Sequence, residues 1–245
     1  MPMATITLPE FAPGSYLVLA TRRGIIKKTP LEQFERVRST GIRAITLDEK
    51  DELAWVDVST GEDDVIITTA QGMLARFAES EVRGMGRDAG GVIGIRLLKR
   101  EGDEVVSMSV VQPGADLLVL TETGYGKRVP VEEFRRKHRG GQGVRLIALE
   151  GRKTGVVAAV QQVTDLDEEL VLISAQGQVV RTDLEAVNRY SPSARGVIVM
   201  RLNEGDRVVG IAAFRPGLAE GRDSDDNGGP DAGPGSGGPP EVGPA

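Results

Sequence analysis

The chain has 245 residues, a formal net charge of −6, no cysteine and a single histidine. The lack of cysteine excludes disulfides and cysteine-ligated zinc or iron–sulfur centres, and one histidine leaves no metal site to expect. No apolar run approaches the ~20 residues of a membrane span, and no signal-peptide pattern is present. The sequence therefore predicts a cytoplasmic protein that does not associate with a membrane.

Residues 1–10 show no regular pattern and predict an irregular N-terminal lead. From residue 11 onward one phrase occurs four times, about fifty residues apart, with glycine at 24, 72, 124 and 177. A short apolar run precedes each glycine, at 17–20, 65–67, 117–120 and 170–173. Such a run predicts a buried strand that enters a tight turn, because glycine accepts positive φ without a Cβ clash.

The rest of each repeat also follows one pattern. Ten residues after each turn glycine stands an apolar residue, predicted to be core: Phe34, Val82, Phe134 and Val187. A second glycine-rich stretch and two more strand-like segments follow, while the best helical candidate, residues 130–137, spans only about two turns. Four strands per fifty-residue unit predict an all-β propeller or pinwheel of about four blades, with a β-solenoid as the alternative. The blades are expected near 11–58, 59–110, 111–163 and 164–214.

The body ends near residue 216, and residues 217–245 form a tail of Gly, Pro, Ser and acidic residues. This tail has six acids and one base, so most of the net charge lies there and the body is nearly neutral. With almost no apolar side chains to bury, the tail is predicted to be disordered.

Charge within the body is uneven. Residues 21–43 and residues 125–145 each hold seven bases and two acids. If the blades share one orientation, these bases gather on one rim, which is the electrostatic footprint of a protein that binds a polyanion. Aromatic residues make up only 4% of the chain, too few for a platform that stacks single-stranded bases, so double-stranded DNA is the predicted partner.

The base four residues after each turn glycine repeats in all four units, as Lys28, Arg76, Arg128 and Arg181. An ordinary solvated charge is the simpler interpretation, but the fourfold register favours a row of phosphate contacts. Glycines and bases at 135–143 suggest a second contact. The predicted DNA-binding residues are Arg22, Arg23, Lys27, Lys28, Arg38, Arg43, Arg76, Arg83, Arg87, Lys127, Arg128, Arg135, Arg136, Lys137, Arg139, Arg181 and Arg195. No catalytic residue and no cofactor are expected in this chain.

Several phrases resemble the C-terminal domain of the DNA gyrase A subunit, in that family's order along roughly residues 11–214. They are Gly24-Ile25-Ile26-Lys27-Lys28-Thr29-Pro30-Leu31, Gly41-Ile42-Arg43-Ala44-Ile45, Val82-Arg83-Gly84-Met85-Gly86-Arg87, Gly124-Tyr125-Gly126-Lys127-Arg128 and Arg139-Gly140-Gly141-Gln142-Gly143-Val144. The resemblance implies a β-pinwheel, whose blades exchange strands and whose basic rim wraps duplex DNA. It also implies a bacterial, nucleoid-associated protein that works with the rest of gyrase A and with gyrase B in ATP-dependent negative supercoiling.

The chain departs from the family in one motif. The family's first blade carries a glutamine-arginine-arginine-glycine-glycine-lysine-glycine box that wrapping requires. The nearest stretch here is Lys137-His138-Arg139-Gly140-Gly141-Gln142-Gly143, in the third unit, which lacks the leading glutamine and has Gln142 at the lysine position. We therefore expect the later blades and the acidic tail of such a domain, with at least one unpaired sheet edge. The topoisomerase IV A subunit is the alternative within this class, and a propeller that binds proteins is the alternative outside it.

Overall fold

The computed structural model describes residues 6, 12–37, 39–167 and 169–214. The predicted tail, and all of the N-terminal lead except Ile6, lie outside these residues. Within them the chain forms strands and short 3₁₀ turns but no α-helix, so the all-β prediction is confirmed. No helix in the described ranges is long and apolar enough to cross a membrane.

The strands are short and follow the fifty-residue period. They are β1 (Tyr16–Thr21), β2 (Ile25–Pro30), β3 (Leu53–Ser59), β4 (Asp64–Thr69), β5 (Met73–Ala78), β6 (Val92–Ile93), β7 (Val105–Val110), β8 (Asp116–Thr121), β9 (Tyr125–Pro130), β10 (Val144–Arg145), β11 (Val157–Val163), β12 (Glu169–Ser174), β13 (Val179–Asp183), β14 (Val197–Ile198) and β15 (Val208–Phe214). The 3₁₀ turns are η1 (Leu31–Phe34), η2 (Glu79–Glu81), η3 (Val131–Glu133), η4 (Gly151–Lys153) and η5 (Leu184–Ala186). The helical candidate at 130–137 is thus reduced to η3.

The four predicted apolar runs lie in β1, β4, β8 and β12, each followed by a tight turn into the next strand. All four turn glycines have positive φ, between 72° and 87°. The amide of Gly124 donates to the Thr121 carbonyl at 3.0 Å, and that of Gly177 donates to the Ser174 carbonyl at 3.1 Å. Glycine is used here because only a residue without Cβ takes this conformation at no steric cost.

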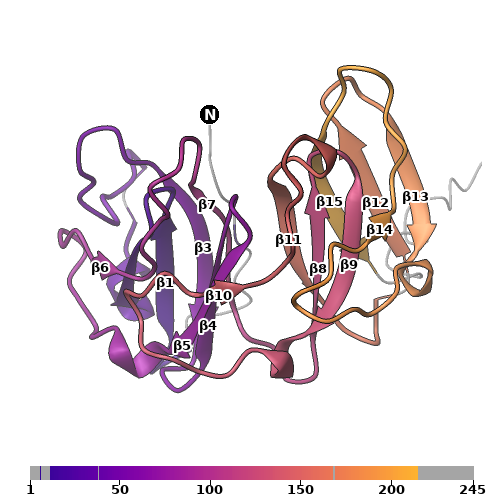
Figure 1. Cartoon of the computed structure of the whole chain (residues 1–245). Helices are drawn as coiled ribbons and strands as arrows, with labels where there is room; N and C mark the ends of the chain where they lie inside the picture. The colour runs from indigo at the N-terminus through magenta and orange to yellow at the C-terminus, as the bar shows by residue number, and fades with distance from the viewer. Residues whose placement is uncertain (1–5, 7–11, 38, 168, 215–245) are drawn as a thin grey trace, which may run out of the picture. The chain divides into compact units, whose positions relative to one another are not determined.

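The strands form four sheets (Figure 1), which we call blades 1 to 4. Their strand orders are β3-β1-β2-β6, β10-β5-β4-β7, β11-β8-β9-β14 and β13-β12-β15. Strands β3, β7, β11 and β15 contact one another in succession, so they form the inner side. The outermost strand of blades 1, 2 and 3 comes from the following sequence unit, which is the strand exchange that the resemblance implied. Among the described strands, β13 receives no such strand, and the expected unpaired edge is found there.

The strand exchange keeps one register throughout. The residue after a loop glycine pairs with the second residue after a turn glycine: Val92 with Ile26, Val144 with Leu74, and Val197 with Gly126. Each of blades 1 to 3 is therefore closed at its outer edge by two residues of the next unit.

The hydrophobic core lies between the blades. Its buried residues form three clusters, and each cluster joins two neighbouring blades. Both faces of β8 are used in this way, because Leu117 packs in the cluster with blade 2 and Leu118 in the cluster with blade 4. The residues ten positions after the turn glycines are all buried, with Phe34 the most exposed at 9%, so the prediction that they are core is confirmed.

Candidate nucleic-acid interface

The bases four residues after the turn glycines hold neighbouring blades together. Lys28 Nζ lies 2.8 Å from Glu79 Oε1 of the next unit, and both side chains are buried. Arg76 binds Asp64 at 2.9 Å and also donates to the carbonyls of Val131 and Phe134 in the next unit. A base held in this way cannot reach a DNA phosphate without breaking these contacts.

Arg128 and Arg181 complete the series but differ from each other. Arg128 donates to the Val187 carbonyl of the next unit at 2.6 Å and its side chain is only 14% exposed. Arg181 pairs with Glu169 of its own blade, and its side chain is 66% exposed. Lys28, Arg76 and Arg128 are therefore each engaged at the interface with the following blade, and the phosphate-contacting row stays a prediction.

Two predicted lysines are also buried. Lys127 Nζ donates to the carbonyls of Ser191, Pro192 and Ala194, and Lys27 Nζ donates to those of Ala44 and Arg87. Burial lowers the pKa of Lys127 to about 8, and burial also lowers the pKa of Lys27. These ammonium groups anchor the glycine loops, and their role in contacting DNA stays a prediction.

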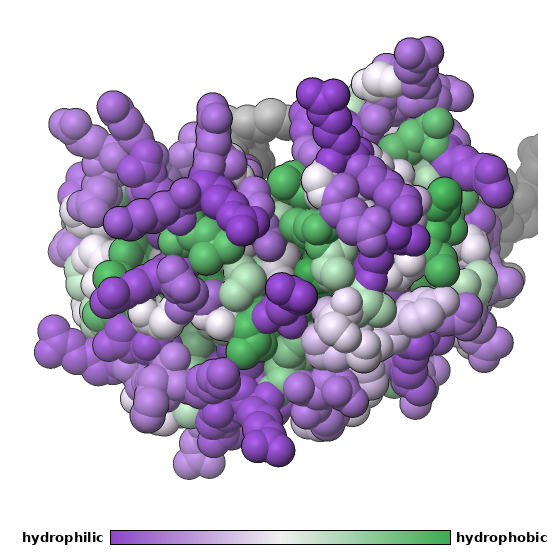
Figure 2. All heavy atoms as spheres, viewed as in Figure 1, coloured by the Kyte–Doolittle hydropathy of each residue, from purple (hydrophilic) through white to green (hydrophobic). Residues whose placement is uncertain are grey.

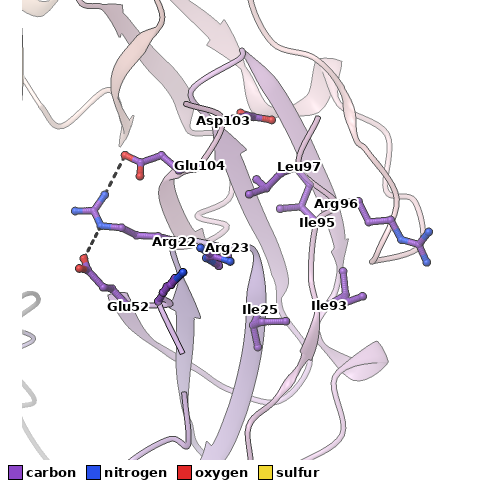
Figure 3. Close-up of a pocket in the computed structure, with 11 residues that line it drawn as sticks. Arg22, Arg23, Ile25, Glu52, Ile93, Ile95, Arg96, Leu97, Asp103 and Glu104 are labelled. Atoms are coloured by element: carbon purple, nitrogen blue, oxygen red, sulfur yellow. Dashed lines mark hydrogen bonds and ion pairs between the residues drawn. The ribbon is translucent and has the colours of Figure 1, made fainter. Parts of the chain in front are cut away.

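Arg22 and Arg23 lie in the first hairpin turn, beside a cleft that Ile95 also lines (Figure 3). Arg22 bridges Glu52 at 3.1 Å and Glu104 at 3.2 Å, so its charge is already balanced. Arg23 is exposed, but its backbone amide is held by Asp51. Of the two arginines in this turn, only Arg23 therefore has a side chain without an ion-pair partner among the described residues.

Two outer loops, residues 81–96 and 135–145, carry a further group of exposed bases. The loops are joined because the Gly140 amide donates to the Gly94 carbonyl at 2.7 Å and the Arg96 amide donates to the Gly141 carbonyl at 2.8 Å. Predicted site residues on them are Arg83, Arg87, Arg135, Arg136, Lys137 and Arg139. Arg83, Arg135 and Lys137 are exposed and make no ion pair with another described residue.

Other bases on these loops are partly engaged. Arg87 is half-buried, and Arg136 pairs with Asp64 at 2.8 Å while its side chain stays 60% exposed. Arg139 donates to the carbonyls of Glu81 and Ile93, which fixes the 135–145 loop on blade 1's outer strand. Arg139 therefore positions the loop.

The box-like stretch 137–143 follows the same loop. Lys137, His138, Gly141 and Gln142 are exposed, while Gly140 and Gly143 have positive φ of 75° and 78°. The His138 side chain is 98% exposed, with Nδ1 3.3 Å from Glu81. The glycines let the loop turn closely over the neighbouring blade, and the polar residues between them face solvent.

Three predicted residues lie away from these loops. Arg43 is exposed, in the glycine loop of the first unit. Arg195 binds Glu150 at 2.6 Å and stacks 5.0 Å over the Tyr125 ring. Arg38 lies outside the described residues.

Sequence reasoning missed two exposed bases on the joined loops, Arg96 and Arg145. Arg145 stands two residues after a loop glycine, as Arg43 does, so the repeat itself carried a signal for it. Figure 2 shows that hydrophilic side chains cover most of the visible face, with hydrophobic patches between them. We call Arg83, Arg96, Arg135, Lys137 and Arg145 the loop-base cluster. An exposed cation cluster of this kind can neutralise several phosphates of a polyanion.

Comparison with known proteins shows where the fold belongs. The family model described as "DNA gyrase C-terminal domain, beta-propeller" matches residues 15–60, 63–112, 115–164 and 168–215. The DNA gyrase A subunit of Pseudomonas aeruginosa is 41% identical over 198 residues, which cover 81% of this chain and 21% of that protein. The Escherichia coli gyrase A protein is 41% identical over 208 residues, which cover 85% of this chain and 23% of that protein.

Two solved structures share the fold. A DNA gyrase A C-terminal domain superposes with a TM-score of 0.74 at 28% identity, covering 84% of this chain and 67% of that one. The C-terminal domain of a DNA topoisomerase IV superposes with a TM-score of 0.79 at 24% identity, covering 87% and 66%, and this likeness bears on the fold alone. The chain spans about a fifth to a quarter of the length of the gyrase proteins it matches. The four matched repeats and the identity to these proteins show that the chain belongs to the DNA gyrase A C-terminal domain family.

Proposed function

We propose that this chain binds duplex DNA without sequence preference, as the DNA-wrapping part of a gyrase A protein. The loop-base cluster is the observation that carries the proposal. Its bases are exposed, lie on two loops that hydrogen bond to each other, and make no ion pair with another described residue. Lysine and arginine in such a position bind backbone phosphates, which hold DNA without reading its sequence.

Family membership supports the biological setting. The relatives are named as the A subunits of DNA gyrase, so we propose that the chain serves a gyrase A protein that works with gyrase B in ATP-dependent supercoiling. In this role the domain supplies no catalytic group and no cofactor. It holds a DNA segment in place while the rest of the enzyme performs the chemistry.

The test is a salt titration of duplex binding. If about six phosphates are neutralised, the logarithm of the binding constant falls against the logarithm of salt concentration with a slope near −5. The double variant Arg135→Gln, Lys137→Gln removes two cluster charges and should make the slope shallower by about 2. Binding should weaken by a similar factor for unrelated DNA sequences.

A matched control removes two exposed bases elsewhere. Arg152 and Lys153 lie in η4, outside the joined loops; both are exposed, and Lys153 pairs with Glu150 at 3.4 Å. Arg152→Gln, Lys153→Gln changes the net charge equally and should leave the slope unchanged. If both double variants change the slope equally, the binding depends on net charge and not on the loop-base cluster. If the binding constant does not change with salt concentration, the proposal is refuted.

A further inference from the structure

The outer loops over blades 1, 2 and 3 are linked in one series. The Arg96 amide donates to the Gly141 carbonyl at 2.8 Å, which joins the loops over blades 1 and 2. One repeat further along, the Ala148 amide donates to the Ala194 carbonyl at 3.2 Å. Ala194 belongs to the loop that leads into β14, the outer strand of blade 3 (Figure 1). The series therefore runs from the loop-base cluster to blade 3.

The bases on this third loop, unlike those of the loop-base cluster, are paired with acids. Arg189 binds Asp116 at 2.6 Å and lies 3.6 Å from Asp165. Arg195 binds Glu150 at 2.6 Å. The five bases of the loop-base cluster make no ion pair with another described residue. The loop over blade 3 therefore continues the series of loops, but its two arginines are already neutralised.

Arg195 is held by an aromatic ring and by one carboxylate. Its guanidinium carbon lies 5.0 Å from the centre of the ring of Tyr125, the first residue of β9. Arg195 donates to Glu150 Oε2 at 2.6 Å, and Lys153 Nζ lies 3.4 Å from the same oxygen. The hydrogen bond from Arg195 is the main cause that lowers the pKa of the Glu150 carboxyl. The carboxylate is therefore charged at neutral pH and balances the guanidinium.

The ion pair between Arg195 and Glu150 is open to water. The two side chains are 30% and 45% exposed. An ion pair that water reaches contributes little to stability, so another anion can replace the carboxylate without unfolding the loop. A phosphate is suited to do this, because guanidinium binds phosphate through paired hydrogen bonds. The ring of Tyr125 holds the cation in place with either anion, since the attraction comes from the aromatic face.

The repeat places Arg195 on the solvent side of its loop. It immediately precedes the loop glycine of the fourth unit. In the other units this position holds Thr40, Gly90 and Gln142, which are all exposed. Arg195 is the only base at this position in the four units, so a charge carried here faces the surface along which the loops are joined.

We propose that Arg195 is a latent DNA contact on blade 3 and that the Glu150 carboxylate keeps this contact closed. The inference rests on the proposed function, because the ligand is the same backbone phosphate. DNA held by the loop-base cluster reaches blade 3, where its phosphate competes with Glu150 for the guanidinium. Lys153 stays beside the carboxylate and balances it when the phosphate takes its place. Glu150 therefore limits how far DNA remains in contact along the loops.

The test is a double-mutant cycle on duplex binding, measured across a range of salt concentrations. Glu150→Gln keeps the size of the side chain and removes its charge, so Arg195 becomes free to neutralise one phosphate. We expect tighter binding, and a slope of log K against log salt that is steeper by about 0.9. Arg195→Gln should leave the slope nearly unchanged, because this base is already neutralised. Adding Glu150→Gln to the Arg195→Gln chain should leave the slope unchanged as well.

A matched control measures the effect of net charge. Glu204 is exposed, lies before β15 and makes no ion pair with another described residue. Glu204→Gln changes the net charge by the same amount and should leave the slope unchanged. Hydroxyl-radical footprinting adds a readout of position, because the protected stretch of DNA should lengthen only in the Glu150→Gln chain. Thermal unfolding of each variant reports whether the fold is kept.

The outcomes separate this inference from the proposed function. The inference is overturned if Glu150→Gln steepens the slope equally in the presence and absence of Arg195, or if Glu204→Gln steepens it as much. A Glu150→Gln chain with the slope and footprint of the unaltered chain also overturns it. In each of these cases the unaltered chain still shows the salt dependence expected of the loop-base cluster. If the unaltered chain shows no salt dependence, the proposed function fails and the inference fails with it.

Discussion

Blades 3 and 4 have nearly the same strand pattern but very different surroundings. Leu118 and Leu120 of blade 3 are fully buried. Val171 and Ile173 stand at the same register in blade 4, where Val171 is partly exposed and Ile173 is 40% exposed. The difference arises because blade 4 covers blade 3, while no described strand covers the outer face of blade 4. In this fold, an apolar side chain on the outer face of a blade is buried only where the next blade covers it.

The ion pairs show the same contrast. Asp116 of blade 3 is 4% exposed and binds both Arg128 and Arg189, the second of which comes from the following unit. Glu169 of blade 4 is 20% exposed and binds only Arg181 among the described residues. The following blade therefore supplies a second cation and also removes water from the pair.

The largest difference between the blades should appear in apolar truncations. Leu118→Ala removes a fully buried side chain and should lower the free energy of unfolding by about 3 to 5 kcal/mol. Val171→Ala, at the matching position, should cost less than about 1 kcal/mol because the side chain already contacts solvent. Urea denaturation of both variants measures the two values. Similar losses would show that the outer face of blade 4 is covered in solution.

The buried carboxylate should give the next largest effect. Asp116→Asn leaves two guanidinium groups without their anion and should cost about 3 kcal/mol. Glu169→Gln breaks a pair open to solvent and should cost at most about 1 kcal/mol. Thermal and urea unfolding of the two variants gives the comparison. An Asp116→Asn variant as stable as Glu169→Gln would contradict the inter-blade role of this cluster.

A pH dependence should also distinguish blade 3 from blade 4, because blade 3 has Lys127 where blade 4 has Val180. Burial lowers the pKa of Lys127 to about 8 in the folded chain, from 10.5. Between these values the unfolded chain holds a proton that the folded chain lacks, so this lysine makes stability rise as pH increases from about 8 to 10.5. Lys127→Met should reduce this rise and leave the part that Lys27 contributes, whereas the exposed Lys153→Met should keep the whole rise. Urea denaturation at pH values below 8, between 8 and 10.5, and above 10.5 measures the change in stability. If stability depends on pH in the same way for the unaltered chain and both variants, Lys127 does not have the lowered pKa.

Much of the fold could be read from the residues. The turn glycines and their apolar runs identified β1, β4, β8 and β12, because local conformational preference and burial act together there. The two-residue strands β6, β10 and β14 could not be derived from local pattern, since a strand this short is defined by the edge that it joins. The resemblance implied strand exchange, but the pairing of Val92 with Ile26 became visible only in three dimensions.

The candidate site was harder to predict. The fourfold register of bases was a true signal, but it marked inter-blade contacts for Lys28, Arg76 and Arg128. A base that recurs in the register of a repeat is as well suited to a repeated internal contact as to a repeated surface contact. Arg83, Arg135 and Lys137 were in the predicted set, and their exposure separates them from Lys27 and Lys127, which differ little from them in sequence.

The sequence by itself determined the repeat, the strands at each turn glycine and the acidic tail, because these depend on backbone preference and composition. Tertiary structure decided which bases are free, because burial and pairing depend on residues about fifty positions away in the next unit. It also decided that β13 ends as an open edge among the described strands. A strand is an edge strand when no other strand pairs with it on one side, and only the folded structure shows which strands pair.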